Sequence, residues 1–340
     1  MTTDGNTTLT APSALLHPQW WAWNEQVWGV EAVELSLQHE RVAGAVLAGA
    51  LFRDRRGRVV TPPMNPHLPI VYSPAGLRAK RLDTQSRAWV SIGDQLAEVL
   101  TAGRLANAVV LPPGLLDARP FTWNGLRAGL SYTYVVDLPR NASLANSSVA
   151  KNIRKSVSRG HRASRSDDWA AILSCLEETE ISKGFSHRLS LDDLKRGARL
   201  MGPDHFRGYV VRDSSGRVVS GGIRLHHEGH RAVDWVQGTT RRVLADGVNQ
   251  LMYDYVMRDL HEAGAMGFDL AGANIREVAL AKSSWGYPLA PQVTLEAAGL
   301  LREARQSIAR NPRAARAIDH GRKVAARLPN GRAKQEGCER

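Results

Sequence analysis

The stretch from residue 249 to residue 286 constrains the fold of this chain more than any other, because helix and strand signals alternate within it. Apolar residues recur at spacings of three and four between Leu251 and Leu260, which is typical of an amphipathic helix. Gly264 occupies the position of a helix C-terminal glycine. Met266–Leu270 then predicts a short buried strand that ends before Gly272.

A second helix is predicted to follow this strand. Asn274 is a candidate N-cap, and Glu277 stands three residues later, as in a capping box. The helix carries Lys282 and ends near Gly286, directly after Trp285. Because ligands of α/β sheets usually bind at strand ends, we expect this lysine and this tryptophan to lie at the mouth of a sheet.

The rest of the chain predicts two halves of similar outline, residues 30–137 and 206–296, each with an antiparallel meander, a central helix, another strand and a further helix. The clearest meander is expected over residues 206–212, 218–226 and 232–238, because polar turn sequences separate these apolar runs. These patterns favour an α+β fold.

Four tryptophans, at positions 20, 21, 23 and 28, fall within eleven residues. They predict either a stacking surface for bases or a helix docked on the first domain. We favour the docked helix, because aromatic side chains at helical spacing usually belong to a core.

The formal net charge of +12 is concentrated in two segments. Residues 140–166 contain seven Lys or Arg and no acid, and residues 301–340 contain eleven against four acids. Such segments are candidate polyanion-binding surfaces, although a solvated basic helix face has the same composition. The candidate tRNA-contacting residues are Lys151, Lys155, Arg159, Arg162, Arg305 and Arg313.

Several protein classes are disfavoured by what the sequence lacks. It has no apolar run of about 18 residues and no apolar signal region near its start, so we expect a cytoplasmic protein without a membrane span. Its two cysteines, Cys175 and Cys338, offer no disulfide framework. The eleven histidines show no ligand spacing, and His226 and His227 are expected on opposite sides of a strand. We therefore predict no metal and no cofactor.

Three motifs in this order resemble the Fem-type aminoacyl transferases, whose fold is GNAT-like. They are FTWNG followed by YTYVVDL at 121–138, KNIRKSVSRG at 151–160, and FDLAGAN followed by ALAKSSWG at 268–286. The resemblance implies two tandem GNAT-like domains with mixed central sheets flanked by helices. We accordingly expect a disordered leader (1–16), an N-terminal domain (17–143), a C-terminal domain with the reaction site (144–296) and a basic helical tail (297–340).

The resemblance also implies an activity. An amino acid would pass from aminoacyl-tRNA to an amine, hydroxylamine or hydroxyl of a peptidoglycan precursor or a natural-product intermediate. The family's catalytic lysine corresponds to Lys282, which would stabilise the oxyanion of the attacked ester. Asp269 would orient Lys282 or a substrate amine, or else cap a strand end. The expected substrate-binding residues are Arg154, Trp235, Asn274 and Trp285. Ala281 departs from the family pattern, in which an aromatic residue is common before the lysine.

Two other functions fit the same residues. An acyl-CoA N-acyltransferase of this fold needs a phosphate cradle of backbone N–H groups before the helix at Asn249. The segment there, residues 242–247, has Ala245 in place of the first glycine and a carboxylate at Asp246, which disfavours a pyrophosphate. A non-catalytic RNA-binding protein would account for the basic segments alone.

Overall fold

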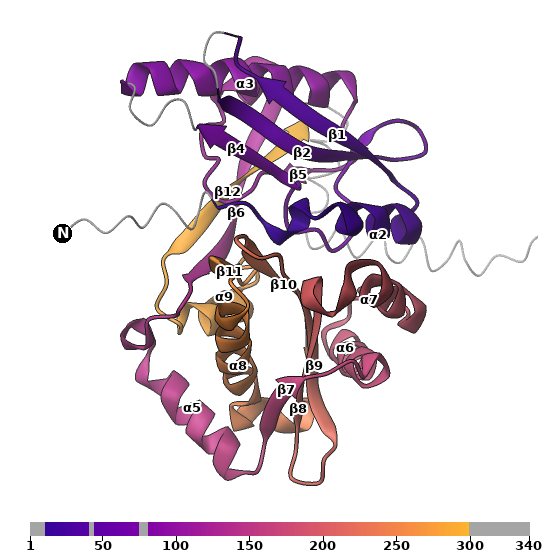
Figure 1. The fold of residues 1–340 in the computed structure, drawn as a ribbon, viewed down its shortest axis with the longest axis vertical. Coiled ribbons are helices and arrows are strands. Elements are labelled where there is room, and N and C mark those ends of the chain that lie inside the picture. Colours follow the sequence, from indigo (N-terminus) through magenta and orange to yellow (C-terminus); the bar gives the residue numbers. More distant parts are fainter. Residues whose placement is uncertain (1–10, 41–43, 75–80, 299–340) are drawn as a thin grey trace, which may run out of the picture. The chain divides into compact units, whose positions relative to one another are not determined.

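The computed structural model describes residues 11–40, 44–74 and 81–298, and the part up to Ala297 belongs to one compact unit (Figure 1). The strands are β1 (Glu31–Gln38), β2 (Ala45–Arg53), β3 (Val59–Val60), β4 (Ile70–Pro74), β5 (Val109–Val110), β6 (Leu126–Asp137), β7 (Arg162–Arg165), β8 (Phe206–Arg212), β9 (Val218–Leu225), β10 (Arg231–Thr239), β11 (Gly267–Asp269) and β12 (Leu289–Ala297). The α-helices are α2 (Pro18–Trp28), α3 (Leu82–Ala102), α4 (Arg119–Trp123), α5 (Ser147–Ser158), α6 (Trp169–Lys183), α7 (Leu191–His205), α8 (Val248–Glu262) and α9 (Arg276–Ser283). Short 3₁₀ turns are η1 (Ala14–Leu16), η2 (Ala142–Leu144) and η3 (Arg241–Asp246).

The described strands form two sheets. A four-stranded antiparallel sheet has the order β1-β2-β3, with β4 also pairing with β2. An eight-stranded sheet has the order β5-β12-β6-β11-β10-β9-β8-β7. Within the larger sheet, β10 and β11 run parallel, whereas its other pairs are antiparallel. The sheet is therefore mixed, and the predicted α+β class is confirmed.

The long pair of β6 and β12 connects the two halves. It runs in register from Leu126↔Ala297 to Tyr134↔Leu289. Val293 and Leu295 of β12 pack in the same core as α3, whereas Tyr134 of β6 packs in the same core as α8. The larger sheet thus continues across residue 143, and the division into domains at that point stays a prediction.

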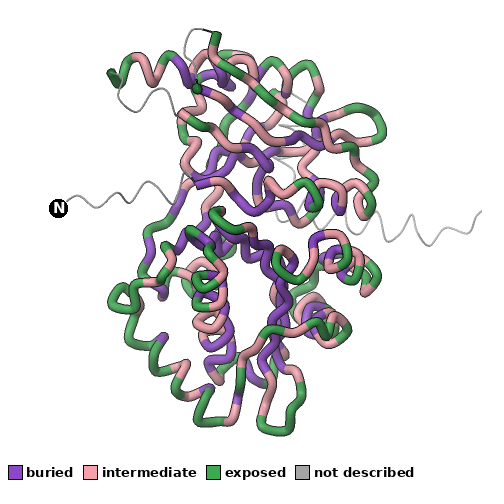
Figure 2. The backbone as a smooth tube through the Cα atoms, viewed as in Figure 1, coloured by how far each residue is buried: buried purple, intermediate pink, exposed green. Residues whose placement is uncertain are grey.

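Helices cover the two faces of the β8–β10 meander (Figure 1, Figure 2). Strand residues alternate between the faces, so β10 sends Ala232 to one core and Val233 to the other. The first core includes α8 residues such as Val256, and the second includes Ile172 of α6 and Leu194 of α7. The three predicted strands of this meander are present, each within one residue of its expected ends. The strand β1 was not among the predicted elements.

The tryptophan-rich helix α2 is part of a core, as favoured, and it packs on the C-terminal half of the chain as well as on the first domain. Trp20 and Trp23 are fully buried and stack with ring centroids 4.8 Å apart. They pack with Trp235 of β10, and Trp23 Nε1 donates to the carbonyl of Asp193 in α7 at 2.9 Å. The docking is therefore shared: α7 and β10 offer most of the apolar face that α2 buries, and Trp20 Nε1 also donates to Asn65 Oδ1 of the predicted first domain at 2.9 Å.

Replacing Trp23 with alanine is expected to destabilise the protein by about 3–5 kcal/mol, because it removes a buried stacked ring and leaves a cavity. Urea denaturation followed by circular dichroism measures this loss. Trp123, which is 63% exposed, provides the matched tryptophan-to-alanine control and should change the free energy of unfolding little. An equal effect of the two substitutions would contradict the assignment of Trp23 to the core.

Candidate active site

The candidate site lies where two parallel strands diverge. β10 and β11 pair only from Arg231↔Gly267 to Val233↔Asp269, after which β10 continues to Thr239 beside β9. The chain after β11 follows β6 instead, because Leu270 N–H donates to the carbonyl of Tyr134 at 2.9 Å. The sheet therefore splits at the carboxyl end of β11, which is the position where such sheets usually bind ligands.

Lys282 reaches into this split from α9. Its Nζ donates to the carbonyl of Leu270 at 2.5 Å and to the carbonyl of Ala271, and it lies 3.5 Å from the carbonyl of Gly272. Ala271 and Gly272 both have positive φ, 50° and 49°, so the turn directs successive carbonyls at the amine. A positive φ is uncommon for alanine and marks a strained turn that the surrounding structure imposes. Two of the three N–H groups are thus held firmly, and the third makes only a long contact.

Burial of the amine lowers the pKa of Lys282 below its ordinary value of 10.5. The carboxylates of Asp234 and Asp269 act in the opposite direction, and Arg224 adds to the lowering. A cation held in a partly desolvated place by carbonyls and distant carboxylates is typical of functional sites.

Asp269 is completely buried and shapes the turn that holds Lys282. Its Oδ1 accepts from Ala271 N–H at 2.9 Å and from Thr133 Oγ1 at 2.5 Å. Its Oδ2 makes no hydrogen bond within the described part of the chain and lies 4.0 Å from His67 Nε2. It does not contact Lys282 directly, so its geometry fits a positioning role.

His67 is a buried neighbour that no pattern in the sequence singles out. Burial lowers its pKa to about 4, although Asp269 opposes the shift. Its Nδ1 lies 2.8 Å from the carbonyl of Leu68, to which the neutral ring donates. The same carboxylate interacts with the buried guanidinium of Arg231, whose pKa burial lowers. The local sequence does not indicate that His67 lies beside Asp269, because His67 stands in a proline-rich loop far from Asp269 along the chain.

A second charged cluster, which the sequence patterns did not identify either, lies on the β10 side of the split. Arg224 Nε lies 3.0 Å from Asp234 Oδ1, and Tyr253 OH donates to Asp234 Oδ2 at 2.5 Å. Both charged residues are buried, and most of the other residues of their strands are apolar. That contrast is a signal that could have identified them, since buried charges occur almost only in pairs.

The four predicted substrate-binding residues are separated by the fold. Trp285 is buried near the site, with its ring 6.1 Å from that of Tyr253. Asn274 is not the N-cap of α9, which is Ile275 without a side-chain bond. Instead, Asn274 Oδ1 accepts from Tyr132 N–H at 2.8 Å, which ties the turn to β6. The prediction of a capping box is therefore wrong.

The other two lie elsewhere. Trp235 packs in the core with Trp20 and Trp23, and its Nε1 donates to the carbonyl of Met64 at 3.1 Å. It points to the sheet face opposite Asp234, because neighbouring strand residues alternate. Arg154 is exposed on α5. Neither residue is brought to Lys282.

The basic helix α5 covers the segment before α8. Lys155 Nζ donates to the carbonyl of Ala245 at 2.7 Å, and Arg159 forms an ion pair with Asp246. Lys151 and Arg162 are exposed, and within the described residues neither forms an ion pair. The predicted residues Arg305 and Arg313, like the rest of the basic tail, lie outside the described residues.

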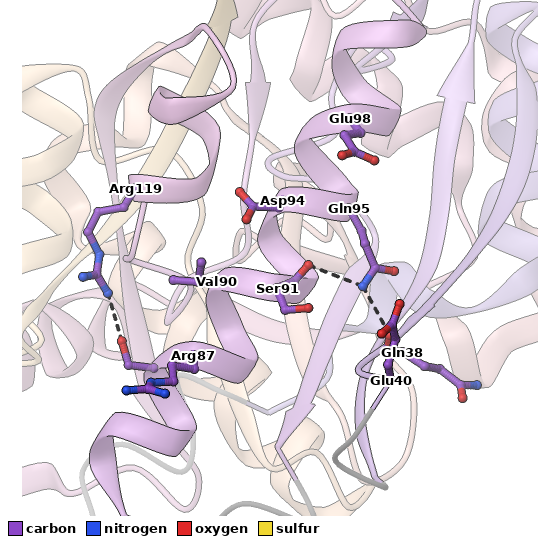
Figure 3. Close-up of a pocket in the computed structure, with 10 residues that line it drawn as sticks. Gln38, Glu40, Arg87, Val90, Ser91, Asp94, Gln95, Glu98 and Arg119 are labelled. Carbon is purple, nitrogen blue, oxygen red and sulfur yellow. Dashed lines mark hydrogen bonds between the residues drawn. The ribbon is translucent and has the colours of Figure 1, made fainter.

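One groove of about 600 Å³ lies along α3, away from these residues. Arg119 reaches across to Ser86, and Gln95 bonds to the carbonyls of Gln38 and Ser91 (Figure 3). None of the predicted site residues lines it. Among the described residues, no helix combines the length and the apolar character that crossing a bilayer requires.

The histidines correct one prediction. β9 ends at Leu225, so His226 and His227 lie beyond it rather than on opposite sides of a strand. His227 instead approaches His17 and His205, and their candidate ligand atoms all lie within 4.8 Å of one another. The spacing of histidines in the sequence does not reveal this group, because its three members come from distant segments.

Comparison with known proteins identifies the fold. No family model matches the chain, and no curated protein matches it in sequence. Among solved structures, FemX is similar with a TM-score of 0.57 at 13% identity, over 82% of this chain and 91% of FemX. The C-terminal domain of a putative lysylphosphatidylglycerol synthetase from Agrobacterium fabrum gives 0.52 at 12% identity, over 86% and 90%. L-PGS from Bacillus licheniformis gives 0.50 at 11% identity, over 86% and 95%.

The chain therefore shares the mixed, two-sheet fold of FemX, and the predicted fold class is confirmed.

Proposed function

We propose that this protein is an aminoacyltransferase that moves an amino acid from aminoacyl-tRNA to an amine, hydroxylamine or hydroxyl acceptor. The observation that carries the proposal is the charged amine of Lys282, held by backbone carbonyls at the split between β10 and β11. Burying a cation without need destabilises a protein, so its retention at a strand end favours a catalytic role.

The chemistry needs no covalent enzyme intermediate, because an aminoacyl ester is already activated. The acceptor nitrogen or oxygen attacks the ester carbonyl, the new bond forms, and the bond to the ribose oxygen breaks. The acceptor's proton leaves and the ribose oxygen is protonated. Negative charge develops on the carbonyl oxygen, and a positioned donor aimed at it contributes about 3–4 kcal/mol. The third N–H of Lys282 can take this role by exchanging its 3.5 Å contact with Gly272 for the oxyanion.

The start of α8 supports tRNA over acyl-CoA as the donor. In a CoA-dependent enzyme, the N–H groups there would face a pyrophosphate. Here α5 packs on this position, since a Cβ added to Gly247 would lie 2.2 Å from the carbonyl oxygen of Asn152. Asp246 adds a carboxylate that Arg159 neutralises within the chain. A pyrophosphate would have to displace both the helix and the ion pair.

The exposed cations of α5 and β7 support an RNA-bound donor. Lys151, Arg154 and Arg162 project from neighbouring elements and are exposed. Phosphate contacts by such side chains supply most of the sequence-independent affinity for a nucleic acid.

The proposal is tested by incubating the full chain with radiolabelled aminoacyl-tRNAs and a panel of amine and hydroxyl acceptors. We expect transfer from at least one aminoacyl-tRNA that pretreatment of the donor with RNase abolishes. Transfer from acetyl-CoA that survives RNase would replace this proposal with an acyl-CoA N-acyltransferase. Copurification of tRNA without turnover on any acceptor would instead indicate a binding protein.

Charge reversal at Lys151 and Arg154, to glutamate, is expected to weaken tRNA binding at low salt. The slope of log affinity against log salt concentration should fall by about one for each phosphate that the variant no longer neutralises. Filter binding over a salt series measures both quantities. Lys183→Glu with Lys195→Glu, two exposed lysines of α6 and α7, makes the same change of net charge and serves as the control. Equal losses in the two double variants would mean that the basic helix is not the tRNA surface.

A further inference from the structure

Three histidines from separate parts of the chain converge on one point of the surface. His17 precedes α2, His205 ends α7, and His227 lies in the turn between β9 and β10. Their ring centroids lie 4.3 Å (His17–His205), 5.2 Å (His17–His227) and 5.3 Å (His205–His227) apart. We propose that His17, His205 and His227 bind one divalent transition-metal ion, with zinc the best chemical match.

The distances are close to those that a metal needs. The candidate ligand atoms lie within 4.8 Å of one another, and all three residues are half-buried. Tetrahedral zinc with Zn–N bonds of about 2.0–2.1 Å separates its nitrogen ligands by about 3.4 Å. Small side-chain rotations, each moving a ring by about 1 Å, bring the three nitrogens to that separation. Three protein ligands then leave the fourth position to water.

The hydrogen bonds of the rings favour coordination at two of the three. His205 Nδ1 lies 3.0 Å from the carbonyl of His226, to which it donates, so Nε2 keeps its lone pair. A backbone carbonyl that fixes the second ring nitrogen in this way is the usual partner of a metal-ligating histidine. His227 Nδ1 is buried and has no hydrogen-bond partner among the described residues. An ion would satisfy this atom or fix its tautomer.

His17 would exchange one interaction for another. Its Nδ1 accepts from Gln19 N–H at 3.1 Å and so caps α2. Coordination through Nδ1 uses that lone pair, and coordination through Nε2 places a proton on Nδ1, so the cap bond is broken in either case. The ion would therefore replace the cap as the group that fixes the start of α2.

Metal binding requires neutral imidazoles, and the pKa values of two of the three rings are lowered. Burial, and then the neighbouring His205, His227 and His230, lower the pKa of His17 to about 4. Burial, and then His230 and His205, lower the pKa of His227, which Glu228 opposes. A site of neutral imidazoles without carboxylates in the ligand set suits zinc, copper or nickel rather than magnesium or calcium.

The ion would act as a clamp rather than as part of the transfer chemistry. It would join the segment before α2 to α7 and to the β9–β10 turn, where Arg231 N–H already donates to the carbonyl of Pro12 at 2.7 Å. None of its ligands belongs to the group around Lys282 and Asp269. Its loss would therefore lower stability and leave the reacting groups in place.

The test is a titration of the untagged, metal-stripped full chain with Zn²⁺ and, for spectroscopy, Co²⁺. We expect one equivalent of tightly bound ion, a rise in Tm on addition of Zn²⁺, and visible Co²⁺ bands of tetrahedral intensity. His227→Gln should weaken binding at least tenfold and remove the Tm rise. It should still fold, because its Nδ1 makes no hydrogen bond with the described residues.

His205→Gln is the second variant and should have the same effect. His261→Gln, at an exposed position at the end of α8, is the control and should bind zinc as the parent chain does. Binding weaker than millimolar in the parent chain, or equal affinity in the His227→Gln and His261→Gln variants, would overturn the proposal. Neither readout depends on transfer activity, so the metal site is tested independently of the proposed function.

Discussion

Replacing Lys282 with methionine is expected to lower the rate of aminoacyl transfer by about a hundredfold or more while the protein still folds. Methionine keeps the length and the apolar stem of lysine but removes the N–H groups that face the carbonyls of Leu270 and Ala271. The loss should fall on the single-turnover rate rather than on tRNA affinity, because the amine is proposed to act on the oxyanion alone. Rapid-quench assays at saturating aminoacyl-tRNA measure this rate.

Two further variants make the result specific. Lys195→Met, at an exposed position of α7, repeats the substitution where no site is expected and should leave the rate unchanged. Lys282→Arg keeps the charge, but a planar guanidinium cannot direct its donors at a tight turn as an ammonium does, so it should also lose most of the rate. An unchanged single-turnover rate in Lys282→Met would rule out the assignment.

The pH dependence gives an independent readout of the same group. Burial lowers the pKa of Lys282 below 10.5, and the protonated amine is the active form. Transfer should therefore fall as the pH rises through this lowered pKa, at a pH below 10.5. Stability should change in the opposite direction. The charged amine is disfavoured in the folded state, so it lowers the free energy of unfolding fully at pH values below the folded-state pKa. This destabilisation disappears as the pH approaches the pKa of the unfolded state. Lys282→Met should abolish this increase in stability at alkaline pH.

Replacing Asp269 with alanine is expected to destabilise the protein by about 3–5 kcal/mol and to reduce transfer strongly. The substitution removes the carboxylate that offsets the burial of Arg231, and it removes the acceptor of Ala271 N–H and of Thr133 Oγ1. The turn that holds Lys282 would then lack the bond that fixes its positive φ. Urea denaturation measures the first effect, and the single-turnover rate at saturating donor measures the second.

The variant Asp269→Asn separates the effect of the hydrogen bond to the turn from the effect of the negative charge. Its amide oxygen can still accept from Ala271 N–H, so the turn should keep its shape, whereas the charge is removed. We expect a smaller loss of transfer than in the alanine variant, with a lower free energy of unfolding than the parent chain. If Asp269→Asn lowered the rate as completely as Lys282→Met without loss of stability, Asp269 would act on the substrate rather than position the turn.

The parts of the fold that follow from local patterns agree with the structure. The short strand predicted at 266–270 is present as β11 (Gly267–Asp269), and the strand β8 has its predicted ends. Lys282 could be selected because its motif resembles a family, and its carbonyl partners stand only ten to twelve residues earlier. These features depend on residues that are neighbours in sequence, where periodicity and turn chemistry act directly.

Other parts depend on contacts across the chain. Asparagine is a common N-cap residue, but the side chain of Asn274 bonds instead to Tyr132, which lies 142 residues away in the sequence. Asp234 pairs with Arg224 only because β9 and β10 bring them together in register. His17, His205 and His227 share no spacing that a sequence pattern could detect.

Spacing along the chain was enough to place most helices and strands, whereas the resemblance of three motifs to a known family indicated the fold and selected one lysine as the candidate catalyst. The folded chain was needed to see how that lysine is held, that α5 covers the start of α8, and that three histidines meet. Such arrangements arise when distant segments pack against one another, and the pairing of buried polar groups there is set by the shape of the whole sheet.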